Sequence, residues 1–252
     1  MEEMNKSCET GGEYTKKQGF SEWLDNFWYH YKWHSIIALF LVFTVTICSL
    51  QMCRKESYDI HVLYSGGHEI SRNSVDGNAP EYKSALSSIA RVTDDFDENG
   101  EVSVTLKDLF MLSTEEIKKI EAEDDDHEVN YALINENQKI LRDSIMYSSY
   151  YVCLLSPSVY NEYKTVDGVE IFEPLAPLIA EDATTTIEYY DACAVYLSST
   201  RFYSLPGIST LPLDTLVCLK TPSVFASHFN KKDTERDYER GRATVIKILN
   251  YE

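Results

Sequence analysis

The strongest pattern along the chain is an uninterrupted apolar run near its beginning. The eighteen residues from Ser35 to Met52 carry no charged side chain. As a helix they would extend about 27 Å, close to the thickness of the hydrocarbon core of a bilayer. The sequence therefore predicts a transmembrane helix over residues 35–53, in which Thr44 and Thr46 hydrogen-bond to carbonyls of their own helix. A cleaved signal sequence is the alternative, but no small-x-small cleavage site follows the run, so we expect the helix to be retained.

The segment before this run has the spacing of an amphipathic helix. Trp23, Phe27 and Tyr31 are among six apolar side chains that recur every three or four positions on one helical face. Tryptophan and tyrosine concentrate at the membrane–water interface. We therefore predict an interfacial helix over residues 20–34, preceded by a flexible polar tail at residues 1–19.

Beyond the membrane segment, strand-like and helix-like patterns alternate. The order of strand, helix, strand, helix and strand is typical of an α/β fold, so residues 56–252 are predicted to form a mixed, mostly parallel sheet with helical crossovers. Two later strand-like runs lie close together in sequence, and we expect them to pair antiparallel. The strand-like runs are YDIHVLYS (58–65), VSVTLKDLFML (102–112), YYVCLLSP (150–157), EYYDACAVYLSS (188–199) and DTLVCLK (214–220).

Short local signals refine these boundaries. Ser113 and Glu116 have the spacing of a capping box, which predicts that a helix begins between them. A long helix is predicted over residues 129–147, with Leu133 on its apolar side. Asp167-Gly168 indicates the turn of a hairpin.

The charge is divided unevenly by the membrane segment. Residues 1–55 hold six basic and six acidic side chains, so the whole net charge of −18 belongs to residues 56–252. Such a domain repels nucleic acid, which excludes it as a partner, and favours cations or basic partners. A merely solvated acidic surface is the alternative interpretation.

Basic residues near the apolar run bear on its orientation. Lys16, Lys17 and Lys32 precede the run, whereas Arg54 and Lys55 follow it, so the positive-inside rule decides little. The large domain after the span favours a cytoplasmic N-terminus and an extracytoplasmic domain at residues 56–252. We therefore predict a single-pass protein of the plasma membrane whose first partner is the lipid bilayer.

Three cysteines in the domain lie within apolar, strand-like runs. Cys153, Cys193 and Cys218 are expected to act as small buried hydrophobic residues. Because their number is odd, they cannot all form disulfides within the domain, although a pair such as Cys193 with Cys218 stays open. A domain without a disulfide framework suits a bacterial surface better than a eukaryotic secretory route.

Several motifs together carry a family resemblance. The segments are YKWHSII, DIHVLYSGG, DDFDENGEVSV, YYVCLLSP and LPGISTLPLDTLVCLK. With them the chain resembles an uncharacterised family of single-pass membrane proteins from clostridia-type Firmicutes, which implies no activity. The core is also distantly similar to one lobe of a type II solute-binding protein. That similarity implies a ligand-binding rim where the first strand and the strand ending in Ser-Pro terminate, at Ser65, Gly66, Gly67, Ser156 and Ser158.

An acidic turn offers a candidate metal site. Asp95, Asp97 and Asn99, followed by Gly100, match the first half of an EF-hand calcium loop. The position that should hold a bidentate glutamate is Leu106, and a strand is predicted to follow, so the segment is not an EF-hand. The alternatives are a partial Ca²⁺ site with these three ligands and a turn in which the side chains bind the loop's own backbone.

Signatures of catalysis are missing from the sequence. It contains no GxSxG, P-loop, GxGxxG or HExxH motif and no zinc-ligand spacing. We therefore expect a non-catalytic, membrane-anchored module that binds or senses a small solute or another membrane protein. The alternatives are a structural or assembly partner of a membrane complex and, with less support, a cell-surface hydrolase.

Overall fold

The computed structural model describes residues 20–53, 58–70, 79–123, 129–180, 187–222 and 224–252. The predicted tail at residues 1–19 lies outside them. The chain divides into two compact units, Met1–Glu56 and Ser57–Glu252.

The first unit contains one long helix, α1 (Phe20–Cys53), which includes both the predicted interfacial segment and the predicted membrane span. Within it, Phe27–Ser49 is long and apolar enough to cross a membrane. The hydroxyl groups of Thr44 and Thr46 donate to the carbonyls of Phe40 and Val42 at 2.8 and 2.7 Å, as predicted. Both hydroxyls are thus satisfied without water.

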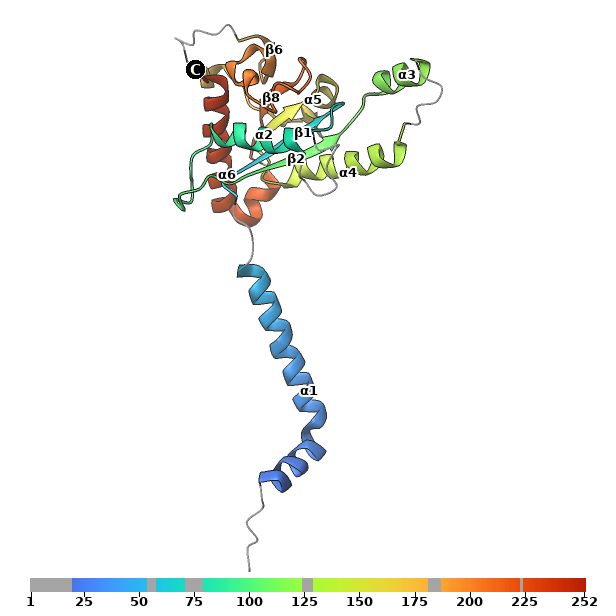
Figure 1. The fold of residues 1–252 in the computed structure, drawn as a ribbon, viewed down its shortest axis with the longest axis vertical. Helices are drawn as coiled ribbons and strands as arrows, with labels where there is room; N and C mark the ends of the chain where they lie inside the picture. Colours follow the sequence, from blue (N-terminus) through green and yellow to red (C-terminus); the bar gives the residue numbers. More distant parts are fainter. Residues whose placement is uncertain (1–19, 54–57, 71–78, 124–128, 181–186, 223) are drawn as a thin grey trace, which may run out of the picture. The chain divides into compact units, whose positions relative to one another are not determined.

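The second unit is built around a six-stranded sheet in the order β2-β1-β3-β8-β7-β6 (Figure 1). Its strands are β1 (Ile60–Gly66), β2 (Val104–Phe110), β3 (Val152–Leu155), β6 (Tyr189–Asp191), β7 (Ala194–Tyr196) and β8 (Leu216–Leu219). The helices are α2 (Pro80–Ala90), α3 (Thr114–Glu123), α4 (Tyr131–Tyr147), α5 (Pro157–Tyr163) and α6 (Val224–Leu249). Short 3-10 helices occupy Ala176–Leu178, Leu197–Ser199 and Arg201–Ser204, and β4 (Thr165–Val166) and β5 (Val169–Glu170) form a separate hairpin.

The sheet is parallel at one end and antiparallel at the other. β1 pairs parallel with both β2 and β3, whereas β3-β8, β8-β7 and β7-β6 are antiparallel. The predicted mixed α/β fold and the antiparallel pairing of the later strands are confirmed. Parallel pairing is confined to β1, β2 and β3, which helical crossovers connect. A tight turn joins β6 to β7, and the longer connection from β7 to β8 (residues 197–215) contains two short 3-10 helices but no crossover α-helix.

Helices cover both faces of this sheet. One apolar cluster joins α2 and α6 to the face that bears Val62 and Tyr64, and the other joins α4 and α5 to the face that bears Leu63. Consecutive residues of β1 thus serve opposite clusters, as the alternation of side chains along a strand requires. β1 and β3 are the strands buried between the two layers, which accounts for their nearly continuous apolar sequence.

Local capping follows the sequence signals. The Ser113 hydroxyl accepts the N–H of Glu116 at 3.1 Å, and the Glu116 carboxylate accepts the N–H of Ser113 at 2.6 Å, so the predicted capping box is confirmed. The hairpin turn at Asp167-Gly168 is confirmed as well, with φ of 52° and 79°. The predicted inward position of Leu133 is wrong: this side chain is exposed and Ile134 is buried in its place.

The cysteines of the domain are free thiols. Cys153 on β3 and Cys218 on β8 are fully buried and directly opposite each other in the antiparallel register, as small hydrophobic residues of the core. Cys193, in the turn between β6 and β7, is partly exposed. Burial raises the pKa of Cys153 to about 12 and raises that of Cys218 well above its usual value. Both therefore stay protonated and inert at neutral pH.

Candidate functional site at the carboxyl ends of β1 and β3

The connections of the parallel strands create a crevice between β1 and β3. From β1 the chain crosses one face of the sheet through α2 to reach the outer strand β2. It then returns through α3 and α4, across the opposite face, to β3 on the other side of β1. Where two crossovers diverge in this way, the carboxyl ends of the adjacent strands are left uncovered, and open α/β sheets bind ligands there.

A cleft of about 430 Å³ lies at this position. This volume is within the usual range for small-molecule sites. The residues that line it come from the ends of β1, β2 and β3, from α3 and from the segment that leads into β8. They are Tyr64, Gly66, Gly67, His68, Leu112, Glu116, Lys119, Ile120, Ser156, Pro212, Asp214 and Thr215.

The five predicted rim residues are brought together, and three of them line the cleft. The N–H of Ser156 donates to the carbonyl of Ser65 at 2.9 Å, which joins the ends of the two strands. Gly66, Gly67 and Ser156 face the cleft, and the Ser158 hydroxyl lies 3.0 Å from that of Ser156. Ser65 is fully buried and does not line the cleft, since its side chain points to the face opposite Tyr64.

The two glycines keep the cleft open. A β-carbon on Gly66 would lie 3.0 Å from the hydroxyl oxygen of Tyr64. A β-carbon on Gly67 would lie 3.3 Å from Leu112 Cδ2 and 3.4 Å from a carboxylate oxygen of Glu116. Neither glycine has a left-handed backbone that would demand its presence. Their structural role is therefore to leave space at the end of β1.

Tyr64 is the functional candidate that the sequence did not reveal. The residue is 1% exposed, yet its hydroxyl has no hydrogen-bond partner within the described part of the chain. Burial and the negative charges of Asp108, Asp214 and Glu116 raise the pKa of this phenol, and the backbone N–H of His68 beside its oxygen only partly opposes them, so the O–H donor is the part of the group that lacks a partner. Tyr64 thus stays protonated, with a donor and an acceptor at the cleft.

His68 adds a second polar atom of the same kind. Its Nε2 is buried and makes no hydrogen bond to any residue that the structure describes. From sequence alone, Tyr64 was one apolar position in a strand and His68 an incidental loop histidine. Their hydrogen-bonding state depends on the placement of β2, α3 and the segment before β8, which no local pattern encodes.

The predicted metal ligands form a turn at the other end of the sheet. Asp95 accepts the N–H groups of Asn99 and Gly100 at 3.1 and 2.7 Å, and Asp97 accepts the N–H of Asn99 at 3.2 Å. The side-chain oxygen of Asn99 accepts the N–H of Glu101 at 2.8 Å. The interpretation as a turn whose side chains bind its own backbone is confirmed.

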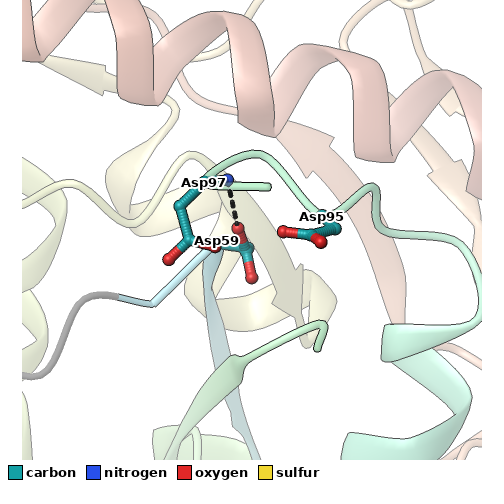
Figure 2. A group of neighbouring side chains, drawn as sticks. All are labelled: Asp59, Asp95 and Asp97. Atoms are coloured by element: carbon teal, nitrogen blue, oxygen red, sulfur yellow. Dashed lines mark hydrogen bonds between the residues drawn. The ribbon is translucent and has the colours of Figure 1, made fainter. Parts of the chain in front are cut away.

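Asp59, at the beginning of β1, completes an acidic cluster with this turn (Figure 2). Carboxylate oxygens of Asp59, Asp95 and Asp97 lie within 4.8 Å of one another. Three carboxylates at this separation are an arrangement that can hold a hard cation such as Ca²⁺. Asp59 was not among the predicted ligands, because it lies far from the turn in sequence.

The hydrogen bonds of Asp59 nevertheless indicate a structural role. One carboxylate oxygen accepts the N–H groups of Phe96 and Asp97 at 2.8 and 3.2 Å, and the other accepts the N–H and hydroxyl of Ser103 at 2.9 and 3.0 Å. Burial alone would raise the pKa of this carboxyl, but these hydrogen bonds outweigh it and lower the pKa. Asp59 thus fastens the turn to β1, and Ca²⁺ binding stays a hypothesis.

Replacing Asp59 with asparagine is expected to lower the free energy of unfolding by about 3 kcal/mol, because an amide N–H₂ would face backbone donors in a buried site. The lowered pKa of Asp59 also contributes stability above about pH 4 that is lost as the pH falls through the folded-state pKa. Chemical unfolding at pH 7 and pH 3 measures both effects. Asp143→Asn, at an exposed carboxyl, is the control. Equal losses of unfolding free energy in the two variants would contradict the structural role of Asp59.

Comparisons with known proteins identify no relative of this chain. No family model, curated protein or solved structure matches the chain. The resemblances noted from sequence motifs therefore remain expectations. The cleft and α1 are the features that bear on function.

Proposed function

We propose that the protein is a membrane-anchored binding module that takes a small polar solute into the cleft at the ends of β1 and β3. The observation that carries this proposal is the buried hydroxyl of Tyr64, which lines the cleft without a hydrogen-bond partner among the described residues. A buried polar group in this state costs about 1–3 kcal/mol. A ligand that supplies the missing partner recovers this cost on binding.

The exposed apolar side chains of α1 support the proposed membrane anchor. Large apolar side chains are exposed at consecutive positions, so they surround the helix instead of forming one stripe. They are Ile36, Ile37, Leu39, Phe40, Leu41, Val42, Phe43 and Val45. Lipid covers a helix on all sides, whereas contact with one partner protein would need a single apolar face. In this proposal the N-terminus is cytoplasmic and the acidic domain is extracytoplasmic.

The binding proposal is tested on the full chain in lipid nanodiscs. A panel of small polar solutes is screened by thermal unfolding, and a solute present at about 100 times its Kd should stabilise the domain by about 2.7 kcal/mol. For a domain of this size the corresponding rise in Tm is about 5–10 °C. Gly67→Val, which fills the cleft between Leu112 and Glu116, should abolish the rise.

Lys139→Ala is the matched control, because Lys139 lies on α4 in a separate groove. It should leave the ligand-induced rise unchanged. A panel in which no solute raises the Tm would contradict a small-ligand function. Replacing residues 20–52 with an unrelated anchor then tests the alternative that the protein is an assembly partner of a membrane complex. An assembly partner should no longer bind its complex once the native helix is replaced.

The proposed topology has its own measurement. Protease added to intact cells should digest residues 58–252 and spare a fragment that contains α1. Extraction at alkaline pH should leave the full chain in the membrane fraction. Protection of the domain in intact cells, with digestion only after lysis, would reverse the orientation.

A further inference from the structure

The cleft is surrounded by carboxylates. Asp108 on β2 is the register neighbour of Tyr64, and the two side chains share a face of the sheet. Glu116 and Asp214 line the cleft itself. The basic groups in the lining are Lys119 and His68. Acidic groups therefore prevail around the buried hydroxyl, within a domain that carries the whole net charge of −18.

The same edge of the sheet offers few donors to an anion. After β3 the chain enters α5 at Pro157, which has no N–H, and the N–H of Ser156 already donates to the carbonyl of Ser65. The N–H of Met111, where β2 ends, donates to the carbonyl of Gly66. Phosphate and carboxylate sites in α/β folds depend on such N–H groups being free at the strand ends.

We infer that the cleft binds a small organic cation that carries a primary ammonium group and a second polar group. The inference rests on the proposed function, because it names the chemistry of the solute. The carboxylates of Glu116 and Asp214 and the oxygen of Tyr64 accept the three N–H donors of the ammonium. The second polar group reaches Nε2 of His68. Each acceptor of this set lines one cleft, and the hydroxyl of Tyr64 is fully buried in it.

The arrangement distinguishes an amine from a neutral molecule of equal size. Partial burial strengthens an ion pair relative to water, and hydrogen bonds to charged groups are worth about 1.5–3 kcal/mol. A diol can satisfy Tyr64 and His68 but brings no positive charge to Glu116 and Asp214, which share the lining with a single lysine, Lys119. The expected preference for a diamine over the matching diol is therefore at least tenfold in Kd.

The test uses the full chain in zwitterionic nanodiscs, with 1,4-diaminobutane and ethanolamine as probes and 1,4-butanediol, ethylene glycol and inorganic phosphate as comparison solutes. Calorimetric titration should detect binding of the amines, and 1,4-butanediol should bind at least tenfold more weakly. Asp214→Asn is expected to weaken amine binding about tenfold or more. Glu170→Gln, an exposed acidic residue on β5, is the charge-matched control and should leave the Kd unchanged.

Tyr64→Phe separates binding from folding. This variant removes an unsatisfied buried hydroxyl, so the ligand-free Tm should stay the same or rise, while amine binding weakens about tenfold. Should a neutral solute or phosphate bind, be blocked by Gly67→Val and outcompete the amines, the binding function stands and the amine inference is wrong. Should no solute bind, both fail. Amine binding that survives Gly67→Val and Asp214→Asn would place the amine outside the cleft and also overturn the inference.

Discussion

Replacing Gly207 with alanine is expected to lower the free energy of unfolding by about 4 kcal/mol, whereas Gly168→Ala should lower it by about 1–2 kcal/mol. Both glycines have a left-handed backbone, with φ of 77° and 79°, so a side chain costs about 1–2 kcal/mol at either position. They differ in their surroundings. A β-carbon on Gly207 would lie 2.3 Å from the backbone nitrogen of Ala85 and 2.7 Å from the carbonyl oxygen of Glu81, whereas no described atom lies within 4 Å of one on Gly168.

The additional loss at Gly207 comes from forcing the loop away from α2. Overpacking of a well-packed site costs about 1–3 kcal/mol, and backbone atoms yield less readily than flexible side chains. The contact also includes the hydroxyl of Ser88, which donates to the carbonyl of Pro206 at 2.7 Å and would lose its partner. Chemical unfolding of the two variants in parallel gives the comparison. Equal losses would show that the close approach to α2 contributes nothing beyond the backbone conformation.

The same loop connects the core to the cleft. The chain continues from Gly207 through Leu211, which is buried in the apolar cluster of α2 and α6, to Pro212 and Asp214 in the cleft lining. Seating Gly207 against α2 therefore helps to fix the position of Asp214. For this reason Gly207→Ala should weaken solute binding as well as stability, whereas Gly168→Ala should affect only stability.

Most elements of the fold could be predicted because their signals are local. The uncharged apolar run indicates α1, the continuous apolar sequence of β3 indicates a central strand, and the capping box of Ser113 and Glu116 gives the beginning of α3. Each signal depends on residues a few positions apart. On α4 the prediction was wrong at Leu133, because the neighbouring Ile134 is the buried residue. Both are apolar, and only the packing against β2 and β3 decides which of them points inward.

The candidate site was only partly predictable, because its chemistry depends on distant segments. Gly66, Gly67 and Ser156 were predicted from the resemblance to a solute-binding lobe, in which the first strand and the strand ending in Ser-Pro form the ligand-binding edge. The unpaired state of Tyr64 cannot be inferred in this way. Asp59 was missed for the same reason, since its partner Ser103 lies 44 residues away in sequence.

Lys220 is the clearest case of a role that only the tertiary structure reveals, and its pH dependence should be large. It follows β8, in a segment whose pattern predicted a strand, and is 1% exposed. Its ammonium donates to the carbonyls of Ser148 and Ser144 at 2.6 and 3.3 Å, near the end of α4, and lies 5.1 Å from the centre of the Tyr151 ring. Burial lowers the pKa of Lys220 to about 8, although the neighbouring Cys153 opposes the shift.

This shift predicts that stability increases with pH between about 8 and 10.5. In that interval the unfolded chain, in which the lysine has its ordinary pKa, binds a proton that the folded chain has released. Below pH 8 both states are protonated, and the folded state bears the full cost of a buried ammonium. A lowering of about 2.5 pKa units corresponds to about 3 kcal/mol at 1.36 kcal/mol per unit.

The effect is isolated by comparing the wild type with Lys220→Met across pH 7 to 10. The raised pKa values of Cys153 and Cys218 make stability decrease above about pH 9. Burial is the main cause and both variants share it, so this part cancels in the difference, whereas the smaller effect of Lys220 on the pKa of Cys153 does not. The wild type should gain about 2.5 kcal/mol relative to Lys220→Met between pH 7 and pH 10, since the unfolded lysine is not yet fully deprotonated at pH 10. The exposed Lys247, paired with Asp94, provides the control, and Lys247→Met should change with pH as the wild type does. Parallel curves for the wild type and Lys220→Met would mean that Lys220 keeps its proton in the folded protein, held by the carbonyls of Ser144 and Ser148.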